Sequence, residues 1–340
     1  MPATSKLQDL LNRRPWLLAD GATGTNLFAI GLESGEPPEF WTEQQPAKIK
    51  ALHQAFVDAG ADIILTNTFG GNARRLMLHQ AEGRTHDLNF KAARLAREVA
   101  DGAGRPVIVA GSVGPTGDLF APLGILTEEM AVAVFVEQCQ GLKDGGADVI
   151  WIETMSAIEE MRAAALAAAK VGMPFTITAS FDTAGRTMMG ITPAALAEAL
   201  AGFDVKPIGI GANCGVGASD TLAAILSITD ANPDAIVISK ANAGMPTLHG
   251  IHVHYSGTPE LMADYARLAV ASGARIIGGC CGTSPEHLAA MRQALDGLER
   301  DGVGVGSARP THAEIVVRTG PFMAPPAVAP AEARKRRRDG

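Results

Sequence analysis

Eight short apolar runs, separated by longer helix-like segments, constrain the fold of this chain more than any other feature. They cover residues 17–21, 62–68, 106–113, 147–154, 175–181, 208–214, 235–242 and the run that leads into Cys280. Continuous apolar runs of this kind are typical of parallel strands buried on both faces. Eight strands, each followed by a helix, predict an α/β fold, a single-domain (β/α)8 TIM barrel. A doubly wound sheet is the alternative, because the number of strands alone does not prove closure.

Glycines at the ends of the helix-like segments support this alternation. Segments 46–59, 128–143 and 259–271 are each followed by glycine: Gly60, the pair Gly145 and Gly146, and Gly273. Glycine adopts the left-handed conformation that ends many helices. We therefore expect each of these helices to stop there and the next strand to begin directly.

Composition sets the domain organisation. The chain has 340 residues, of which 47% are hydrophobic, and this is enough for a large core. We expect the barrel to span residues 1–300. Residues 301–340 are rich in Gly, Pro and Ala and end in a basic run, so a mobile tail is predicted there. The net charge of −7 argues against nucleic-acid and anionic-membrane partners, and no apolar run is long enough to cross a membrane.

Four cysteines indicate the redox setting. The N-terminal residues lack the apolar segment of a secretory signal, so we expect a reducing, cytoplasmic environment. Clustered cysteines there indicate metal binding or catalysis rather than disulfides. Cys139 falls within a helical segment and is expected in the core. Cys214, Cys280 and Cys281 instead stand where the sixth and eighth strands end.

Polar or special residues stand at the C-terminal end of nearly every predicted strand. They are Asp20, Asn67, Ser112, Glu153, Asn213, Cys214, Asn242, Cys280 and Cys281. Barrel enzymes carry their active sites on this face. The pattern therefore predicts one site, to which most strands contribute.

The three strand-end cysteines predict a zinc site. Zn2+ prefers thiolate ligands in a tetrahedral shell, and a catalytic site keeps one position open. Glycines beside Cys280 and Cys281 allow the turn that two neighbouring ligands need. Zinc lowers the pKa of a bound thiol, so this site suits alkylation at sulfur. Asn242 could fill the open position or only cap a turn, and three buried structural thiols are the alternative to metal.

Several motifs resemble the homocysteine S-methyltransferase family. The similar segments are residues 20–25, 66–72, 111–115, 153–154, 213–215 and 279–283, within a resemblance that covers roughly residues 10–297. That family includes betaine–homocysteine methyltransferases and the homocysteine-binding module of cobalamin-dependent methionine synthase. The resemblance implies a (β/α)8 barrel, zinc on Cys214, Cys280 and Cys281, and transfer of a methyl group to homocysteine in methionine biosynthesis.

The resemblance also implies how homocysteine binds. Its sulfur would lie on zinc, with the amino-acid end nearer the first four strands. Glu153 would pair with the ammonium, as a carboxylate can through charge-assisted hydrogen bonds, and Asp20 would assist. Gly21, Ala22 and Ser112 would lie close to the carboxylate or the backbone of the substrate, and Asn67 is a further candidate.

The methyl donor is left open by the sequence. Trp41 resembles a loop tryptophan of the betaine enzymes, and an aromatic cage would suit that quaternary ammonium. Gly70 and Thr154, however, stand where those enzymes have tyrosines. Residues 66–72 are more similar to the cobalamin-dependent module, which implies that the chain is a separate subunit that receives the methyl group for homocysteine from a methylcorrinoid protein. S-methylmethionine is a third possible donor.

Two other function classes remain as alternatives. A zinc-dependent barrel hydrolase would use histidines, and His252-Val253-His254 has the spacing of a metal-binding pair. This pair follows the end of the seventh strand, so we expect a loop position instead. A non-catalytic zinc-binding partner subunit is the second alternative. The presence of Asp20 and Glu153 beside the cysteines favours a working thiol site.

Overall fold

The eight predicted strands form one closed parallel barrel. The computed structural model describes residues 5–244, 246–249 and 252–323, with only the backbone described for 246–249 and 252–254. The strands follow the order β1 (Leu17–Leu18), β10 (Ala274–Gly279), β7 (Val237–Ala241), β6 (Ile210–Cys214), β5 (Phe175–Ala179), β4 (Val149–Met155), β3 (Ile108–Val113) and β2 (Ile63–Leu65). A parallel bridge between Ala19 and Ile63 joins the two ends, where Asp62 N donates to Leu18 O at 2.6 Å. The (β/α)8 barrel is thus confirmed, and the doubly wound sheet is excluded.

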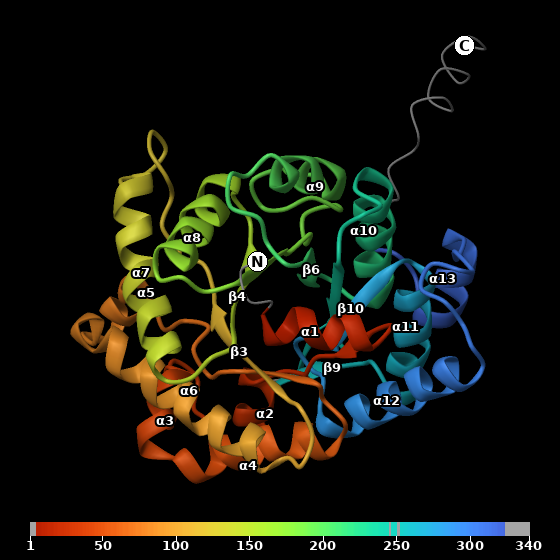
Figure 1. Ribbon diagram of the computed structural model, residues 1–340, viewed down its shortest axis with the longest axis horizontal. Coiled ribbons are helices and arrows are strands. Elements are labelled where there is room, and N and C mark those ends of the chain that lie inside the picture. Colours follow the sequence, from red (N-terminus) through yellow and green to blue (C-terminus); the bar gives the residue numbers. More distant parts are fainter. Residues whose placement is uncertain (1–4, 245, 250–251, 324–340) are drawn as a thin grey trace.

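Helices surround the barrel (Figure 1). The major ones are α2 (Gly24–Ala29), α4 (Pro46–Asp58), α6 (Thr85–Gly102), α7 (Glu128–Asp144), α8 (Ile158–Lys170), α9 (Pro193–Ala201), α10 (Ala218–Ala231), α11 (Pro259–Ala271) and α12 (Pro285–Arg300). Between β1 and α6 lie the short elements η1 (Pro38–Phe40), α3 (Trp41–Gln44), α5 (Ala73–Leu76), η2 (Met77–His79) and η3 (Glu82–Arg84). Helices α7, α9 and α11 each begin after a threonine whose hydroxyl accepts a first-turn N–H.

The predicted glycine stops are present. Gly60, Gly146 and Gly273 have φ values of 101°, 99° and 102°. After α4, Ala61 N donates to Phe56 O and Gly60 N donates to Val57 O, which is a Schellman motif. This geometry ends the helix and turns the chain into the next strand without a long loop.

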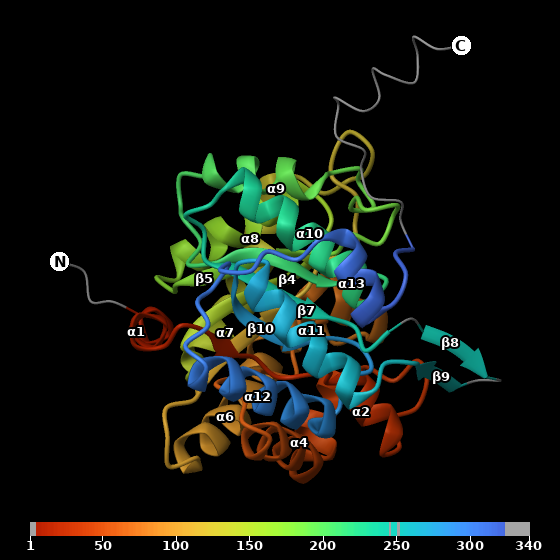
Figure 2. The same cartoon turned by 90° about the vertical axis from the view of Figure 1, so that its right-hand side faces the viewer.

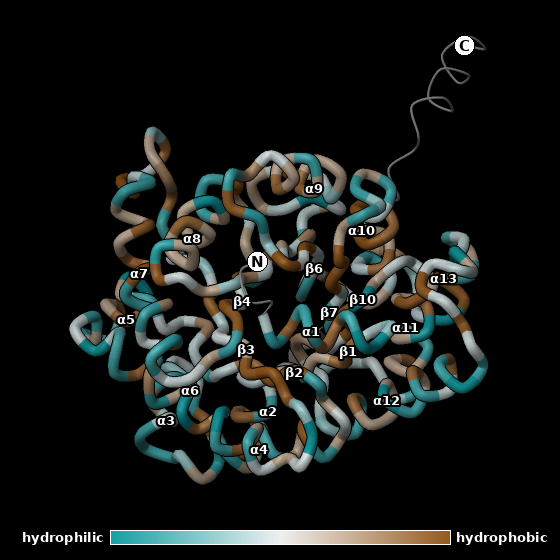
Figure 3. Tube along the Cα trace, in the orientation of Figure 1, coloured by the Kyte–Doolittle hydropathy of each residue, from teal (hydrophilic) through white to brown (hydrophobic). Residues whose placement is uncertain are grey.

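Side chains alternate across the strands and fill two layers. Trp151, Ile238 and Ile276 belong to the inner cluster, which fills the barrel. Their neighbours, such as Ile150 and Ile277, belong to the outer cluster, which packs against the helices. In Figure 3 the strands are largely hydrophobic, and the surrounding helices carry both hydrophilic and hydrophobic residues. A residue two positions beyond an inner-layer residue therefore points into the upper barrel.

The N-terminal end of the barrel is closed by α1 (Lys6–Arg13). Leu7, Leu10 and Leu11 of this helix belong to the inner cluster. Arg275 holds the helix end by donating to Leu11 O at 2.6 Å and to Arg14 O at 2.9 Å. The helix therefore plugs the barrel at the end opposite the predicted site (Figure 2).

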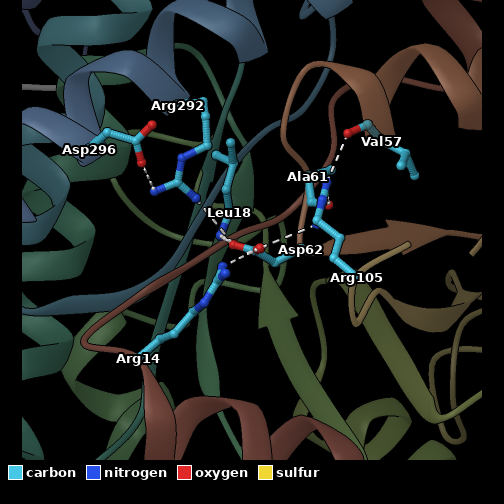
Figure 4. Close-up of polar contacts among 8 residues, drawn as sticks. All are labelled: Arg14, Leu18, Val57, Ala61, Asp62, Arg105, Arg292 and Asp296. Atoms are coloured by element: carbon cyan, nitrogen blue, oxygen red, sulfur yellow. Dashed lines mark hydrogen bonds and ion pairs between the residues drawn. The ribbon is translucent and has the colours of Figure 1, made fainter. Parts of the chain in front are cut away.

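A buried carboxylate ties the barrel seam together at this same end (Figure 4). Asp62 is 2% exposed and pairs with Arg14 at 2.6 Å, Arg292 at 3.3 Å and Arg105 at 3.6 Å. It also accepts a hydrogen bond from Leu18 N at 2.9 Å. One aspartate thus links β1, α12 and the segment before β3.

A two-stranded hairpin, which the sequence did not predict, follows β7. Strands β8 (Pro246–His249) and β9 (His252–Tyr255) pair antiparallel and lie at the end of the molecule opposite α1 (Figure 2). His252 and His254 belong to β9, but their side chains lie outside the described part of the chain. Tyr255 is the last residue of β9 and points into the site described below.

Part of the segment expected to be a tail packs on the barrel. Helix α13 (His312–Thr319) contacts α10 and α11, and its Ile315 is fully buried. Ser219 of α10 donates to Gly320 O at 2.6 Å. Residues 324–340, with the basic run, lie outside the described residues, so a mobile tail remains a prediction for them. Among the described helices, none is both long and apolar enough to cross a membrane.

The Asp62 network gives a stability prediction. Asp62→Asn should lower the free energy of unfolding by roughly 2–4 kcal/mol, because it leaves partly buried guanidinium groups without their shared counter-charge. Thermal and urea denaturation measure this change. The matched control is Asp101→Asn, which removes an exposed i,i+4 partner of Arg97 and should cost less than about 0.5 kcal/mol. Equal stability of the two variants would contradict this account of the seam.

Candidate metal and substrate site

The structure brings the three strand-end cysteines together. Their sulfur atoms all lie within 4.8 Å of one another, and Cys214 Sγ is 3.9 Å from Cys281 Sγ. Strand β7 separates the two cysteine-bearing strands, so that Cys214 pairs in register with Ala241 while Cys280 N donates to Ala241 O at 2.7 Å. Cys214 and Cys280, which are 66 positions apart in the sequence, are thus separated in space by one strand.

Backbone geometry aims these sulfurs inward. Cys214 has φ 61°, the left-handed region that non-glycine residues seldom adopt. After Cys280 the chain turns, and Thr283 N donates to Cys280 O at 3.1 Å. Gly279 permits this turn, since a Cβ atom there would lie 2.2 Å from Thr283 Cγ2. A left-handed cysteine costs on the order of 1 kcal/mol, which indicates a conformation held for function.

The protonation of the thiols explains why this cluster suits a cation. Hydrogen bonds from Cys214 and Cys280 hold the pKa of Cys281 well below its usual range. Contacts with Cys280 and Cys281 raise the pKa of Cys214, and burial adds to the effect. Without a cation, the cluster therefore favours one thiolate and two thiols. A divalent metal ion would compensate three negative sulfurs at this spacing.

Asn242 is the predicted fourth ligand of this site. Its amide is 3% exposed and donates from Nδ2 to Gly215 O at 2.8 Å. Its Oδ1 atom is buried with no hydrogen-bond partner among the described residues. Asn242 directly follows Ala241, which pairs in register with Cys214, so this unpartnered oxygen favours the predicted role of a ligand that yields its position to substrate. The residues present thus suit a tetrahedral metal.

Asn213 stabilises the cluster from below, a role that the sequence did not predict. Its Oδ1 atom accepts hydrogen bonds from Thr154 N at 2.8 Å and Thr178 Oγ1 at 2.7 Å. Its Nδ2 atom donates to Thr154 Oγ1 at 2.7 Å and approaches Cys280 Sγ at 3.9 Å. Thr154 is itself left-handed, with φ 60°. Asn213 therefore fixes the end of β4 and orients one sulfur.

A cavity of about 350 Å³ opens beside the cysteines. It is lined by Gly21, Ala22, Thr23, Gly24, Thr25, Phe28, Leu65, Glu153, Lys240, Tyr255, Gly279, Cys280 and Cys281. The Tyr255 hydroxyl helps to lower the pKa of the Cys281 thiol. A cavity of about 360 Å³ lies near α1, at the other end of the barrel, and contains none of the predicted site residues.

Glu153 is the carboxylate that lines this cavity. Its Oε1 atom accepts a hydrogen bond from Ser112 Oγ at 2.5 Å, so Ser112 orients Glu153 rather than lining the cavity itself. Burial raises the pKa of Glu153 to about 7, although the Lys240 charge acts in the opposite direction. Glu153 therefore changes charge near neutral pH.

Lys240 is a site residue that the sequence analysis missed. It is 2% exposed and donates from Nζ to Asp20 Oδ1 at 2.9 Å. Burial alone would lower the pKa of Lys240, but the charges of Asp20 and Glu153 raise it overall. The signal was present in the strand: Lys240 lies two positions after Ile238, which faces the barrel interior, and charged residues are rarely buried without a partner.

Trp41 and Asn67, which the sequence predicted to bind substrate, do not line the cavity. Trp41 is buried in a cluster with Leu27, Leu32 and Ile49, and its indole N–H donates to Glu36 Oε1 at 3.0 Å. Asn67 donates from Nδ2 to Pro38 O at 2.6 Å, which fixes the loop that carries Trp41. Both side chains therefore have structural contacts instead of lining the cavity.

The loop after β1 contributes backbone to the cavity. Gly21 and Ala22 line it, and their contact with the substrate backbone stays a prediction. A Cβ atom at Gly21 would lie 2.7 Å from Thr283 O, and Ala22 N donates to that same oxygen at 3.1 Å. The first and last loops of the barrel are therefore packed together beside Cys280 and Cys281.

Comparisons with known proteins agree with this geometry. The family model described as homocysteine S-methyltransferase matches residues 17–295. The methionine synthase of Mycobacterium tuberculosis (strain ATCC 25618 / H37Rv) is 31% identical over 315 residues, 86% of this chain and 26% of that protein. The methionine synthase of Mycobacterium leprae (strain TN) is 29% identical over 82% of this chain and 24% of its own length. This chain thus spans about a quarter of these relatives.

A solved structure matches over nearly its whole length. The metallated form of the homocysteine methyltransferase MmuM from Escherichia coli superimposes with a TM-score of 0.71 at 26% identity. The match covers 84% of this chain and 99% of that one. The barrel and its extent are therefore shared with a protein that has been solved with metal.

The cysteine cluster gives a metal-binding prediction. Cys281→Ala should weaken Zn2+ affinity by more than about 100-fold, because it removes one of three thiolate ligands from a site built around them. Metal content by atomic emission and competition with a chelator measure this loss. The matched control is Cys139→Ala on α7, a buried thiol outside the cluster, which should bind Zn2+ as the unchanged protein does. Unaltered affinity in Cys281→Ala would remove the cluster as the metal site.

Proposed function

This chain belongs to the homocysteine S-methyltransferase family, and we propose that it is a zinc-dependent enzyme that methylates homocysteine to methionine. The observation that carries the proposal is the convergence of Cys214, Cys280 and Cys281 beside a cavity lined by Glu153. Three thiolates suit Zn2+ and quench its ability to activate water. The thiol of a substrate then suits the remaining position on the metal.

The chemistry divides between the metal and the chain. Zinc, when bound, would lower the pKa of the homocysteine thiol from about 8.5 and keep the sulfur nucleophilic at neutral pH. The residues of the chain position the substrate. Glu153 pairs with the ammonium group, and Ser112 keeps that carboxylate directed at the cavity. Alignment of sulfur with the methyl carbon is the main contribution to the rate.

The geometry helps to rank the methyl donors. A quaternary ammonium such as betaine needs several aromatic faces around its methyl groups. Among the described residues, Phe28 and Tyr255 are the aromatic side chains that line the cavity, and Trp41 is packed elsewhere. We therefore place betaine third, after a methylcorrinoid protein and S-methylmethionine.

Neither alternative function gains support from the site. A zinc hydrolase would rely on histidine and aspartate ligands, but within the described part of the chain the candidate metal cluster consists of cysteines alone. A non-catalytic zinc subunit would not need a cavity that presents an oriented carboxylate next to the sulfurs.

The proposal is tested by assay of the zinc-loaded protein. Homocysteine is supplied with betaine, S-methylmethionine or a methylcorrinoid donor in separate reactions, and methionine is measured by mass spectrometry. We expect methionine from one of the last two donors, and Cys281→Ala should abolish its formation. Methionine formed from betaine alone would overturn the ranking of donors. No methionine from any donor, with zinc bound, would overturn the function.

The role of Glu153 gives a second test. Glu153→Gln should raise the homocysteine KM by about 10- to 100-fold with unchanged zinc content, since it removes a charge-assisted hydrogen bond. In the unchanged protein, kcat/KM should rise with pH through about 7, because the protonated form that dominates below that pH cannot pair with ammonium. The Glu153→Gln variant should lack this step.

Glu160→Gln is the control for this test. Glu160 is another buried carboxylate, bound to Thr116 N at 2.8 Å and Thr116 Oγ1 at 2.7 Å, and it does not line the cavity. Its variant should keep the homocysteine KM and the pH step. If both variants raise KM equally, the effect is a general loss of stability rather than loss of an ammonium contact.

A further inference from the structure

The upper barrel presents one positive and one negative side chain to the cavity. Among the described residues that line it, Lys240 is the cation and Glu153 is the carboxylate. Both come from inner-layer positions of facing strands, two residues beyond Ile238 on β7 and Trp151 on β4. This pair matches the two charges of an α-amino acid.

Asp20 is already fully engaged. Its Oδ1 atom accepts the hydrogen bond from Lys240 at 2.9 Å, and its Oδ2 atom accepts one from Leu65 N at 2.7 Å. It is 1% exposed and is absent from the cavity lining. Asp20 thus holds Lys240 in place and offers no free oxygen to a ligand.

Lys240 and Glu153 each retain hydrogen-bonding capacity that faces the cavity. In the described part of the chain, the Lys240 ammonium has one hydrogen-bond acceptor, Asp20, and so has two further N–H groups to donate. Glu153 receives its hydrogen bond on Oε1, and its Oε2 atom has none from any described residue. A ligand that brings one carboxylate and one ammonium would satisfy both.

From this arrangement we infer that Lys240 binds the α-carboxylate of the substrate while Glu153 binds its α-ammonium, with Asp20 as the residue that positions Lys240. The inference rests on the proposed function and deepens it. It reassigns Asp20 from a direct substrate contact to a support, and it assigns a specificity-determining role to a residue with no predicted function.

The strand register agrees with this placement. Lys240 pairs with Asn213 on one side and with Gly278 on the other. Asn213 comes one position before Cys214, and Gly278 comes two positions before Cys280. Lys240 therefore lies deeper in the barrel than the cysteine sulfur atoms. Homocysteine has two methylene groups between its sulfur and its α-carbon. Its sulfur can therefore lie at the cysteine level while its charged groups reach the level of Lys240 and Glu153.

A comparison of truncated substrates isolates the contact. The three thiols are homocysteine, 3-aminopropane-1-thiol, which lacks the carboxylate, and 4-sulfanylbutanoate, which lacks the ammonium. Each is measured by equilibrium binding to the zinc-loaded protein and by methyl transfer. The proteins are the unchanged chain, Lys240→Met, Glu153→Gln and the double variant Asp20→Asn with Lys240→Met. The double variant is included because Lys240→Met alone leaves Asp20 buried without its partner.

The inference predicts a specific pattern. The unchanged protein should bind homocysteine about 10- to 100-fold more tightly than 3-aminopropane-1-thiol, as expected for a charge-assisted hydrogen bond. Lys240→Met and the double variant should lose this preference and keep the preference for homocysteine over 4-sulfanylbutanoate. Glu153→Gln should lose the preference for homocysteine over 4-sulfanylbutanoate and keep the preference for homocysteine over 3-aminopropane-1-thiol. Zinc content should stay the same in all four proteins.

Other outcomes overturn the inference without ambiguity. If Lys240→Met and the double variant weaken homocysteine and 3-aminopropane-1-thiol by the same factor, Lys240 only balances buried charge. If these variants bind both thiols as tightly as the unchanged protein does, and so retain the full preference for the carboxylate, another group binds the carboxylate. Failure of the unchanged protein to bind or methylate any of the three thiols would instead remove the proposed function itself.

Discussion

The pairing of β7 between β6 and β10 is the constraint on which the site depends. Ala241 stands in register with Cys214 and accepts the N–H of Cys280, so one residue of β7 sets the spacing of both cysteine segments. That residue is itself fixed, because its N–H donates to Tyr265 Oη at 3.1 Å and this hydroxyl lies 2.6 Å from Ser239 Oγ. Parallel pairing places consecutive strand ends at one rim, and closure of the barrel keeps them there. The sulfur cluster is therefore a product of strand order, and glycines and a left-handed cysteine complete its local shape.

The pleat of the strands then decides which charges enter the barrel. Inner positions carry apolar residues deep in the barrel and polar residues one step higher, as Trp151 and Glu153 show on β4. Charges in such a setting are stable only when they are paired or hydrogen-bonded. Asp20 and Lys240 form such a pair, and Ser112 supports Glu153. The upper barrel is consequently an enclosed set of fixed charges, and a zwitterionic ligand adds no net charge to it.

Much of this arrangement could be predicted from the sequence because it follows from local pattern. Apolar runs and glycine stops located the strands, and the cysteines at strand ends located the sulfur cluster. The role of Lys240 was missed because the seventh strand was interpreted as a uniform apolar run, whereas its inner face ends in a charge. Tyr255 and the β8–β9 hairpin were missed because their position depends on contacts between distant segments. Trp41 shows the opposite error. A motif can locate a tryptophan in a loop, but only the packing of Leu27, Leu32 and Ile49 decides whether its ring is available.

The leucine plug of α1 has a consequence for how reactants move. Leu7, Leu10 and Leu11 close the barrel at the α1 end, and the cavity beside the cysteines lies at the opposite end. The two reactants of the proposed methyl transfer would both reach the cavity from that end. Under the proposed function, the amino acid with its deeper charged contacts would enter before the methyl donor, and methionine would leave after the demethylated donor. If the chain acts as proposed, a helix at the far end of the molecule would thereby set the order in which the two reactants enter and leave.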